Sequence, residues 1–233
     1  MANLSCRSVR QRIQDGDGFM RAVIFDMDGV IFDSERIVYE LWLELSEKYG
    51  FPDLRTPYWN VIGVNARQAR ETFLDFYGHE FPYDFYKAEQ SRLYHERYDG
   101  GRLPLKEGVR PLLHALREAK IYTALASSTR TDLVVRQLAD AGLLDYFSFV
   151  VGGDQVVKSK PEPEIFLRAL AGTDISPAGT VVIEDAFNGI RAASRAGMRP
   201  IMVPDLLPPD MEMKNLAEAI LDDLRQVQTY LGL

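Results

Sequence analysis

Two acidic pairs and one lysine are the residues of this chain that could do chemistry together. Asp26 and Asp28 lie two positions apart, Glu184 and Asp185 are adjacent, and Lys160 lies between the pairs in the sequence. Carboxylate oxygens are the ligands that Mg²⁺ prefers, and a carboxylate can also attack a phosphoryl group as a nucleophile. Because phosphoryl oxygens are anionic, such an attack needs a cation that offsets the charge repulsion.

The candidate residues lie near short apolar segments, which predict the buried strands of a parallel sheet. These segments are Ala22–Phe25, Ile121–Ala126, Phe149–Val151, Thr180–Ile183 and Pro200–Val203. Helical patterns separate the later segments, at Thr131–Ala141, Pro163–Leu170 and Phe187–Ala196. Strands that alternate with single helices predict an α/β fold with a doubly wound parallel sheet. Because ligands bind outside the carboxyl ends of such strands, we expect the candidate residues to meet in one crevice.

The interval between the first two predicted strands is too long for a single crossover helix. It spans residues 26–120, whereas one crossover needs only about a dozen residues or somewhat more. Apolar and aromatic side chains recur at helical spacing in Ser34–Tyr49, Ala66–Tyr77 and Tyr83–Tyr98, and again in Val109–Ala119. The first three patterns indicate an inserted module made of helices.

The chain is therefore expected to have three parts. We expect an α/β catalytic core at 19–34 and 101–233, an α-helical cap domain at 35–100 and a flexible N-terminal extension at 1–18. Phe32–Ser34 and the glycine pair at 100–101 are the expected hinges between cap and core. Because residues 1–18 lack apolar periodicity, their deletion is expected to leave stability and activity nearly unchanged.

The composition limits the classes of partner. The formal charge of -7 argues against a nucleic-acid groove, which needs clustered lysine and arginine. No apolar run approaches the roughly 20 residues of a membrane span, and residues 1–18 lack the apolar region of a signal peptide. Cys6 is the only cysteine, which fits a reducing cytoplasm. We expect a cytoplasmic monomer that binds neither nucleic acid nor membrane.

The types of residue at the strand ends suit phosphoryl transfer. Asp26 would attack the phosphorus and form an aspartyl-phosphate, and Asp28 would protonate the leaving alkoxide and later activate water. Lys160 would neutralise a phosphoryl oxygen, while Ser127, Ser128 and backbone N–H groups at a helix N-terminus would bind the others. Oxygen atoms of Asp26, Asp185 and Glu184 are candidate Mg²⁺ ligands, with Glu184 either a ligand or a support.

Each cluster taken alone has a purely structural interpretation as well. Asp-x-Asp-Gly is common in turns, and Ser127 could simply cap the next helix. Lys160 precedes a proline and could be a surface lysine, and an acidic pair is favourable at a helix N-terminus. It is the joint occurrence of acids, hydroxyls and a lysine at successive strand ends that favours phosphate chemistry.

The same clusters resemble a known family. Four motifs of the haloacid dehalogenase superfamily are matched in order, by Asp26–Glu35, Ser127, Ser159–Phe166 and Ile183–Ile190. The resemblance extends from about Met20 to Val203 and implies a Rossmannoid core. The cap position, together with the Gly-Val-Ile and Glu-Asp segments, places the chain near the β-phosphoglucomutase-like branch of small-sugar phosphatases and mutases. It implies a nucleophilic Asp26, an acid/base Asp28 and a metal ligand in the Asp28 backbone carbonyl.

Three functions remain open after the resemblance is considered. We favour a Mg²⁺-dependent phosphatase of a small phosphorylated metabolite, with a sugar phosphate as one candidate. The first alternative is a phosphosugar mutase of the β-phosphoglucomutase type, and the second is a non-catalytic binding protein with the same fold. Retention of both aspartates, the lysine and the Glu-Asp pair argues against the non-catalytic alternative.

The cap segments depart from the mutase pattern. Val38 occupies the position of a histidine in the mutase, and Asn65 and Arg67 lie in a loop that reads Gly-Val-Ser-Arg there. Asn65 and Arg67 are candidate substrate contacts, although solvated residues at a helix start would look the same. Thr129 and Arg130 fall where the mutase contacts a distal phosphate. These departures favour hydrolysis over mutase action.

Overall fold

The computed structural model describes residues 20–64 and 66–233. The expected extension at 1–18 and the candidate contact Asn65 lie outside the described residues. No helix within the described ranges is both long enough and apolar enough to cross a membrane.

A six-stranded sheet forms the centre of the core, with all neighbouring strands parallel. Its strands follow the order β3-β2-β1-β4-β5-β6, so the first strand lies at the centre. Their bounds are β1 Ala22–Phe25, β2 Tyr122–Ala126, β3 Phe149–Val151, β4 Thr180–Glu184, β5 Arg199–Met202 and β6 Ala219–Ile220. Order reverses around β1, which creates the type of crevice where open α/β sheets bind ligands. The predicted α/β fold is confirmed.

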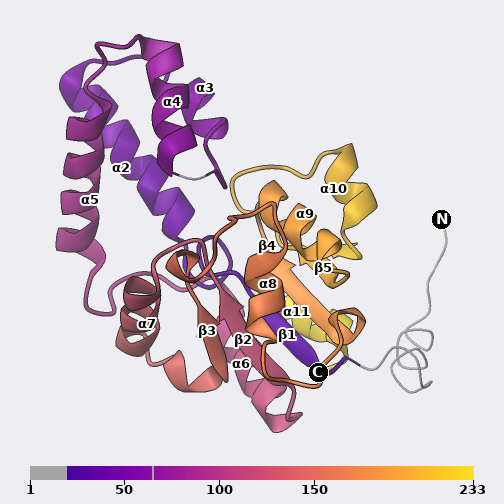
Figure 1. The fold of residues 1–233 in the computed structure, drawn as a ribbon. Helices are drawn as coiled ribbons and strands as arrows, with labels where there is room; N and C mark the ends of the chain where they lie inside the picture. The colour runs from indigo at the N-terminus through magenta and orange to yellow at the C-terminus, as the bar shows by residue number, and fades with distance from the viewer. Residues whose placement is uncertain (1–19, 65) are drawn as a thin grey trace.

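Helices cover both faces of this sheet, which explains the continuous apolar runs of the central strands. Val23 and Phe25 of β1 pack in one apolar cluster with the helices at 109–118, 131–140 and 224–231, whereas Ala22 and Ile24 pack in another with the helices at 164–169 and 187–195. Figure 1 shows these layers. The core helices are α6 Val109–Glu118, α7 Thr131–Asp140, α8 Glu164–Ala169, α9 Phe187–Arg195, α10 Met211–Leu216 and α11 Leu224–Leu231. Single 3₁₀ turns lie at Leu144–Tyr146, Gly153–Gln155 and Pro177–Gly179.

The register of the central strands brings distant segments to one edge. Phe25 at the end of β1 pairs with Leu125 of β2 on one side and with Ile183 of β4 on the other. Consequently the chain leaves all three strands at nearly the same height. The residues that follow these strands must therefore be neighbours in space, although more than 150 positions separate the first from the last.

The cap is a lobe of four helices that stands apart from the sheet (Figure 1). It consists of α2 Ser34–Tyr49, α3 Arg55–Trp59, α4 Ala66–Tyr77 and α5 Tyr83–Tyr98. Trp42 is the centre of its apolar cluster, with ring centroids 4.9 Å from Phe73 and 5.7 Å from Tyr83. The bounds predicted for α2, α4 and α5 are confirmed, whereas the sequence analysis did not predict α3.

Two tethers join the cap to the core side by side. Asp33 N–H donates to the Pro104 carbonyl at 3.0 Å, and Lys106 N–H donates to the Ile31 carbonyl at 2.9 Å. The outgoing and returning chains are thus held together by backbone hydrogen bonds at the base of the cap. One of the expected hinge segments, Phe32–Ser34, lies within this paired link.

Candidate active site

A buried charge cluster occupies the carboxyl edge of the central strands. Asp26 follows β1, Glu184 ends β4, and Lys160 comes from the loop before α8. Lys160 Nζ lies 2.5 Å from Asp26 Oδ1 and 2.7 Å from Glu184 Oε1. The three side chains are 7%, 9% and 1% exposed for the lysine, Asp26 and Glu184 respectively. Lys160 is therefore not the surface lysine of the structural interpretation.

Two features determine the pKa values in this cluster: all three side chains are buried, and one lysine faces two carboxylates. Burial raises the pKa of Asp26 to about 7, although the nearby Lys160 opposes the rise. Burial alone would lower the pKa of Lys160, but the attraction of Asp26 and Glu184 outweighs it and holds that pKa above its ordinary value. Lys160 is consequently charged at neutral pH, and it is the cation next to the proposed nucleophile.

The second aspartate of the first motif is held from two directions. Ser34 Oγ donates to Asp28 Oδ1 at 2.7 Å, and Thr129 Oγ1 donates to Asp28 Oδ2 at 3.1 Å. Ser34 is the first residue of the cap helix α2, whereas Thr129 follows β2 in the core. The carboxylate of Asp28 is thus bound at the junction of cap and core. Thr129, a candidate substrate contact in the sequence analysis, contacts this carboxylate.

The loop after β2 supplies hydroxyl groups to the same edge. Ser127 is fully buried, and its Oγ accepts a hydrogen bond from Thr129 N–H at 3.0 Å. This bond uses the oxygen as an acceptor, so the hydroxyl proton can be donated elsewhere. Ser128 lines the cleft described below. Arg130 pairs with Asp132 at 3.0 Å, its side chain is 71% exposed, and it does not line that cleft.

The two residues of the Glu-Asp pair face different partners. Glu184 Oε1 accepts from Lys160, and its Oε2 accepts from Ala186 N–H at 2.6 Å. Asp185 instead lies against Gly29, where an added Cβ would be only 2.4 Å from Asp185 Oδ2. Gly29 also has φ +80°, so both the backbone conformation and the space require glycine. The loop of the first motif thereby approaches Asp185 directly.

This donor set fits a magnesium ion that keeps several waters. Asp26 and Asp185 offer hard carboxylate oxygens, and burial together with neighbouring carboxylates raises the pKa of Asp185 well above its usual range. In the described part of the chain, no three acidic, histidine or cysteine side chains converge into a cage for a metal ion. An ion here would thus need backbone, water or substrate oxygens as well, as Mg²⁺ sites usually do.

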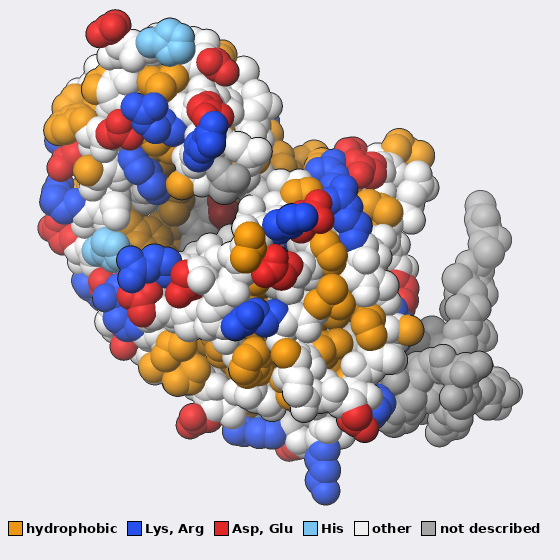
Figure 2. Space-filling model, in the orientation of Figure 1, with side chains coloured by type: hydrophobic (Ala, Val, Ile, Leu, Met, Phe, Trp, Pro, Cys, Tyr) orange, Lys and Arg blue, Asp and Glu red, His pale blue; other side chains and the backbone are white. Residues whose placement is uncertain are grey.

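A cleft of about 960 Å³ separates the cap from the charge cluster. Figure 2 shows it as a hollow between the helical lobe and the core. Asp26, Asp28 and Lys160 lie on its core side. The cap side carries Val38 and Arg67, and Arg67 is 86% exposed and pairs with Glu71 at 2.9 Å. The sequence analysis thus placed Arg67 at the cleft but missed other residues of the cap wall.

The missed residues are Glu35, Lys87, Gln90 and Tyr94, which also line the cleft. Glu35 is next to Ser34 in the first motif, so its position was a usable signal. Lys87 and Gln90 are three positions apart on α5, which puts them on one face of that helix. No motif marks that face, because a helix presents several faces and only packing decides which one borders a cleft.

Comparisons with known proteins agree with this geometry. The family model for haloacid dehalogenase-like hydrolases matches residues 23–203. A phosphorylated carbohydrates phosphatase of Thermotoga maritima is 34% identical over 188 residues, 78% of this chain and 84% of the relative. A β-phosphoglucomutase of Bacillus subtilis is 32% identical over 219 residues, 89% and 95% of the two chains. The solved β-phosphoglucomutase of Clostridium difficile superposes with a TM-score of 0.70 at 25% identity and covers 92% of this chain and 98% of its own.

The chain therefore belongs to the haloacid dehalogenase-like hydrolases, an enzyme family. Its relatives place it on the branch that contains β-phosphoglucomutases and phosphatases. The resemblance seen in the four sequence motifs is confirmed.

Proposed function

We propose that this protein is a magnesium-dependent phosphatase that hydrolyses a small phosphorylated carbohydrate through an aspartyl-phosphate on Asp26. The observation that carries the proposal is the buried contact of Lys160 with Asp26 and Glu184 at the sheet edge. A charged lysine at this place offsets the negative charge that a phosphate monoester brings to a carboxylate. The Thermotoga maritima relative, named for phosphorylated carbohydrates, supports the substrate class.

The residues that would hold magnesium are the side chains of Asp26 and Asp185 and the backbone carbonyl of Asp28. We assign Glu184 to Lys160 rather than to the ion, because Lys160 and Ala186 N–H already engage both of its oxygens. When bound, the ion supplies positive charge between the phosphoryl oxygens and the attacking carboxylate.

The first half of the reaction transfers the phosphoryl group to the enzyme. A carboxylate oxygen of Asp26 attacks phosphorus, and the bond between phosphorus and the leaving oxygen breaks. Asp28, in its protonated form, gives its proton to that leaving oxygen. The alcohol product departs and leaves an aspartyl-phosphate, with Asp28 ionised.

The second half returns the enzyme to its starting state. Asp28 takes a proton from a water molecule as that water attacks the phosphorus of the aspartyl-phosphate. The bond to Asp26 breaks, inorganic phosphate is released, and Asp28 holds the proton needed for the next cycle. Asp28 can serve both halves because it gives a proton in the first and takes one in the second, and it forms no bond to phosphorus itself.

The phosphate oxygens need fixed donors during both halves. The Ser127 hydroxyl retains its proton for this purpose, since its oxygen accepts from Thr129 N–H. Lys160 offers a charged donor at the same edge, and Ser128 borders the cleft beside them. Donors that are already oriented stabilise the developing charge without reorganisation.

Hydrolysis is favoured over mutase action by the cap side of the cleft. A mutase must exclude water from its aspartyl-phosphate until a sugar returns, and closure of the cap must control the acid/base group. Val38, which lines the cleft, has no hydrogen-bonding group with which to couple closure to Asp28. The similarity to a β-phosphoglucomutase keeps mutase action as the alternative.

A direct assay tests the proposal. Purified protein should release phosphate from p-nitrophenyl phosphate in the presence of Mg²⁺, and EDTA should abolish the activity reversibly. Mn²⁺ should substitute, whereas Ca²⁺ should inhibit, because its longer bonds and larger ligand number would displace the nucleophile. Full activity in exhaustively chelated buffer would contradict the metal dependence.

The same preparation distinguishes hydrolysis from mutase action. With β-glucose 1-phosphate and a bisphosphate primer, phosphate release should exceed formation of glucose 6-phosphate. If the isomerised sugar dominates and free phosphate stays near background, the mutase alternative is correct. The expected cytoplasmic location and monomeric state stay predictions, and size-exclusion chromatography with light scattering would test the second.

A further inference from the structure

The cap wall that faces the charge cluster carries a polar group of its own. Lys87 Nζ donates to Gln90 Oε1 at 2.7 Å, and both residues come from α5 and line the cleft. Gln90 is buried at 2% exposed, whereas Lys87 is exposed and borders the cleft. A buried amide thus accepts a hydrogen bond from an ammonium group at the wall of the cleft.

Lys87 differs from the other lysine and arginine residues at the cleft. Each of the others pairs with carboxylates: Arg67 with Glu71, Arg70 with Asp84, and Lys160 with Asp26 and Glu184. Among the described residues, Lys87 is the cleft-lining lysine or arginine that forms no ion pair within 4.0 Å. The N–H donors of Lys87 that Gln90 does not use therefore remain available for a ligand.

Glu35 supplies the complementary acceptor on α2. Its side chain is half-buried at the cleft, and its backbone carbonyl accepts from Tyr58 Oη at 3.3 Å, which fixes the helix start. Burial, followed by the charges of Asp28 and Asp205, raises the pKa of the Glu35 carboxyl to about 8. Lys87 is the cation that acts on it in return.

The remaining cap wall is apolar and aromatic. Trp42, Tyr58 and Tyr83 line the same cleft, and each is less than 10% exposed. Such rings suit the C–H faces of a sugar or polyol, while an ionic group placed against them would lose hydration without compensation. A hydroxyl group, in contrast, both donates and accepts, so it can bind a carboxylate and an ammonium group together.

We infer that Glu35 and Lys87 determine specificity by binding hydroxyl groups of an uncharged sugar or polyol leaving group. The inference rests on the proposed phosphatase function and deepens it. A substrate with a second phosphate is disfavoured, since the aromatic wall would strip water from a second anion and Lys87 alone would offset that loss. The pair thus selects monophosphates over bisphosphates.

Steady-state kinetics on three kinds of substrate test this inference. The substrates are a panel of aldose and polyol monophosphates, p-nitrophenyl phosphate and fructose 1,6-bisphosphate. For the wild type, kcat/KM for the best monophosphate should exceed the value for the bisphosphate at least tenfold. Lys87→Met should lower the ratio of kcat/KM for that monophosphate to kcat/KM for p-nitrophenyl phosphate about tenfold or more, mainly through KM. Lys87→Arg should recover much of the ratio.

Three further variants complete the design. Glu35→Leu should lower the ratio of kcat/KM for the monophosphate to kcat/KM for p-nitrophenyl phosphate, because it removes the acceptor, whereas Glu35→Gln keeps an acceptor oxygen and should retain much of that ratio. Lys48→Met replaces a cap lysine that does not line the cleft and should leave every ratio unchanged. Wild-type preference for the bisphosphate, or an unchanged ratio in Lys87→Met, overturns the inference while phosphatase activity stands. Absence of Mg²⁺-dependent p-nitrophenyl phosphate hydrolysis in the wild type overturns the proposed function itself.

Discussion

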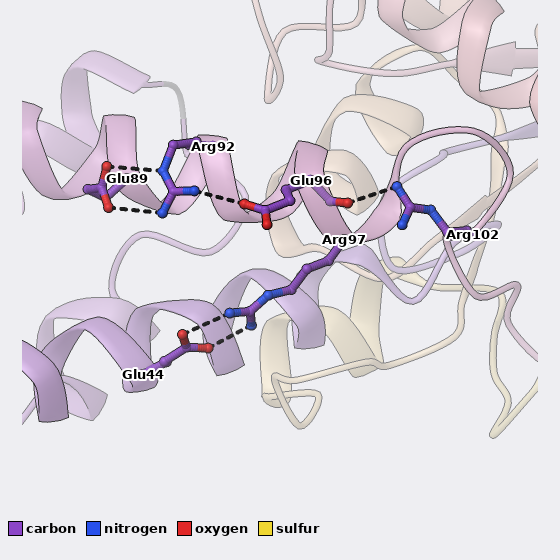
Figure 3. Close-up of polar contacts among 6 residues, drawn as sticks. All are labelled: Glu44, Glu89, Arg92, Glu96, Arg97 and Arg102. Carbon is purple, nitrogen blue, oxygen red and sulfur yellow. Dashed lines mark hydrogen bonds and ion pairs between the residues drawn. The ribbon is translucent and has the colours of Figure 1, made fainter.

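The core and the cap both contain pairs of basic and acidic side chains, but they use them differently. In the core, Lys160 and its two carboxylate partners are almost fully buried. In the cap, Arg97 of α5 pairs with Glu44 of α2 at 2.6 Å, with both side chains more than 40% exposed. Figure 3 shows this pair beside the contacts of Arg92 with Glu89 and Glu96 on the same helix.

Burial separates the charges that serve catalysis from those that stabilise the surface of the cap. Burying an ion pair costs desolvation that its attraction barely repays, so a buried pair is weak evidence for stability. An exposed pair on a helix costs little and contributes little. We therefore expect core substitutions to change activity or break the fold, and cap substitutions to tune stability and selectivity.

The largest expected effect is on turnover in Asp26→Asn. Asparagine is nearly isosteric, but it is neither an anionic ligand nor an adequate nucleophile, so activity should fall below about 1% of wild type. Circular dichroism and thermal melting should show that the variant folds. Clean, folded protein that keeps more activity would remove Asp26 from its assigned role.

Asp28→Asn should cost less than the change at Asp26. The backbone carbonyl is kept, but proton transfer is lost, so kcat should fall by about 10²–10⁴-fold. The amide oxygen can still accept from one of the hydroxyl groups of Ser34 and Thr129, and the amide N–H can donate to the other, which preserves the junction between cap and core. An activated leaving group such as p-nitrophenolate needs little protonation, so its first half-reaction should suffer less. Equal losses for good and poor leaving groups would argue against the acid role.

Lys160→Met tests how strongly the stability of the buried charge cluster depends on the positive charge of the lysine. It leaves Asp26 and Glu184 buried without a cation, which we expect to cost about 3–5 kcal/mol of unfolding free energy. Urea denaturation in EDTA measures this cost. The double variant Lys160→Met with Glu184→Gln removes one excess carboxylate and should recover part of the loss. A change below about 1 kcal/mol in the single variant would show that the cluster tolerates unpaired charge.

The sequence allowed the core site to be predicted because strand ends converge. Once β1 and β4 were recognised, the parallel register brought Asp26 and Glu184 to one edge. The sequence did not reveal that Glu184 and Asp185 have different partners. Adjacent residues at a strand end point in opposite directions, and only the packing of Lys160 and Gly29 decides which carboxylate each one meets.

The cap was less predictable for a physical reason. Its long helices were evident from periodicity, and their predicted bounds agree with the structure. Their cleft-facing residues were not evident, because Lys87 and Gln90 on the polar side of α5 look like any solvated helix face. The sequence analysis also missed α10 and α11, and it missed β6 and α3, which have too few residues for a periodic signal.

Glu35→Gln tests whether ionisation of Glu35 at the cap wall destabilises the folded protein. Burial, with the charges of Asp28 and Asp205, raises the pKa of Glu35 from 4.5 to about 8. The folded state therefore holds a proton that the unfolded state has lost, and stability from this group decreases as pH rises from about 4.5 to 8. Glutamine does not titrate, so the unfolding free energy of the variant should rise by about 1–2 kcal/mol relative to wild type across this window. The figure is smaller than the full pKa difference implies, because Glu35 is half-exposed and solvent screens its charge.

Urea denaturation at pH 5 and pH 8.5 in EDTA measures this gain. Glu47→Gln, on the exposed side of the same helix, is the matched control and should show no such trend. If the two variants behave alike at both pH values, Glu35 titrates like an ordinary surface glutamate and the electrostatic description of the cap wall is wrong.

The smallest effect is expected for the exposed pair of Arg97 and Glu44. Arg97 donates two hydrogen bonds to Glu44, at 2.6 and 2.8 Å, and so links α5 to α2 across the cap. Even with this two-pronged geometry, exposed pairs contribute only about 0.2–1 kcal/mol and weaken in salt. Arg97→Gln should therefore lower the unfolding free energy by about half a kcal/mol at low salt and by less in about 1 M NaCl, with kcat/KM unchanged. The double variant with Glu44→Gln isolates the pairwise contribution. A coupling energy that approaches the cost of Lys160→Met would remove the distinction between buried and exposed pairs.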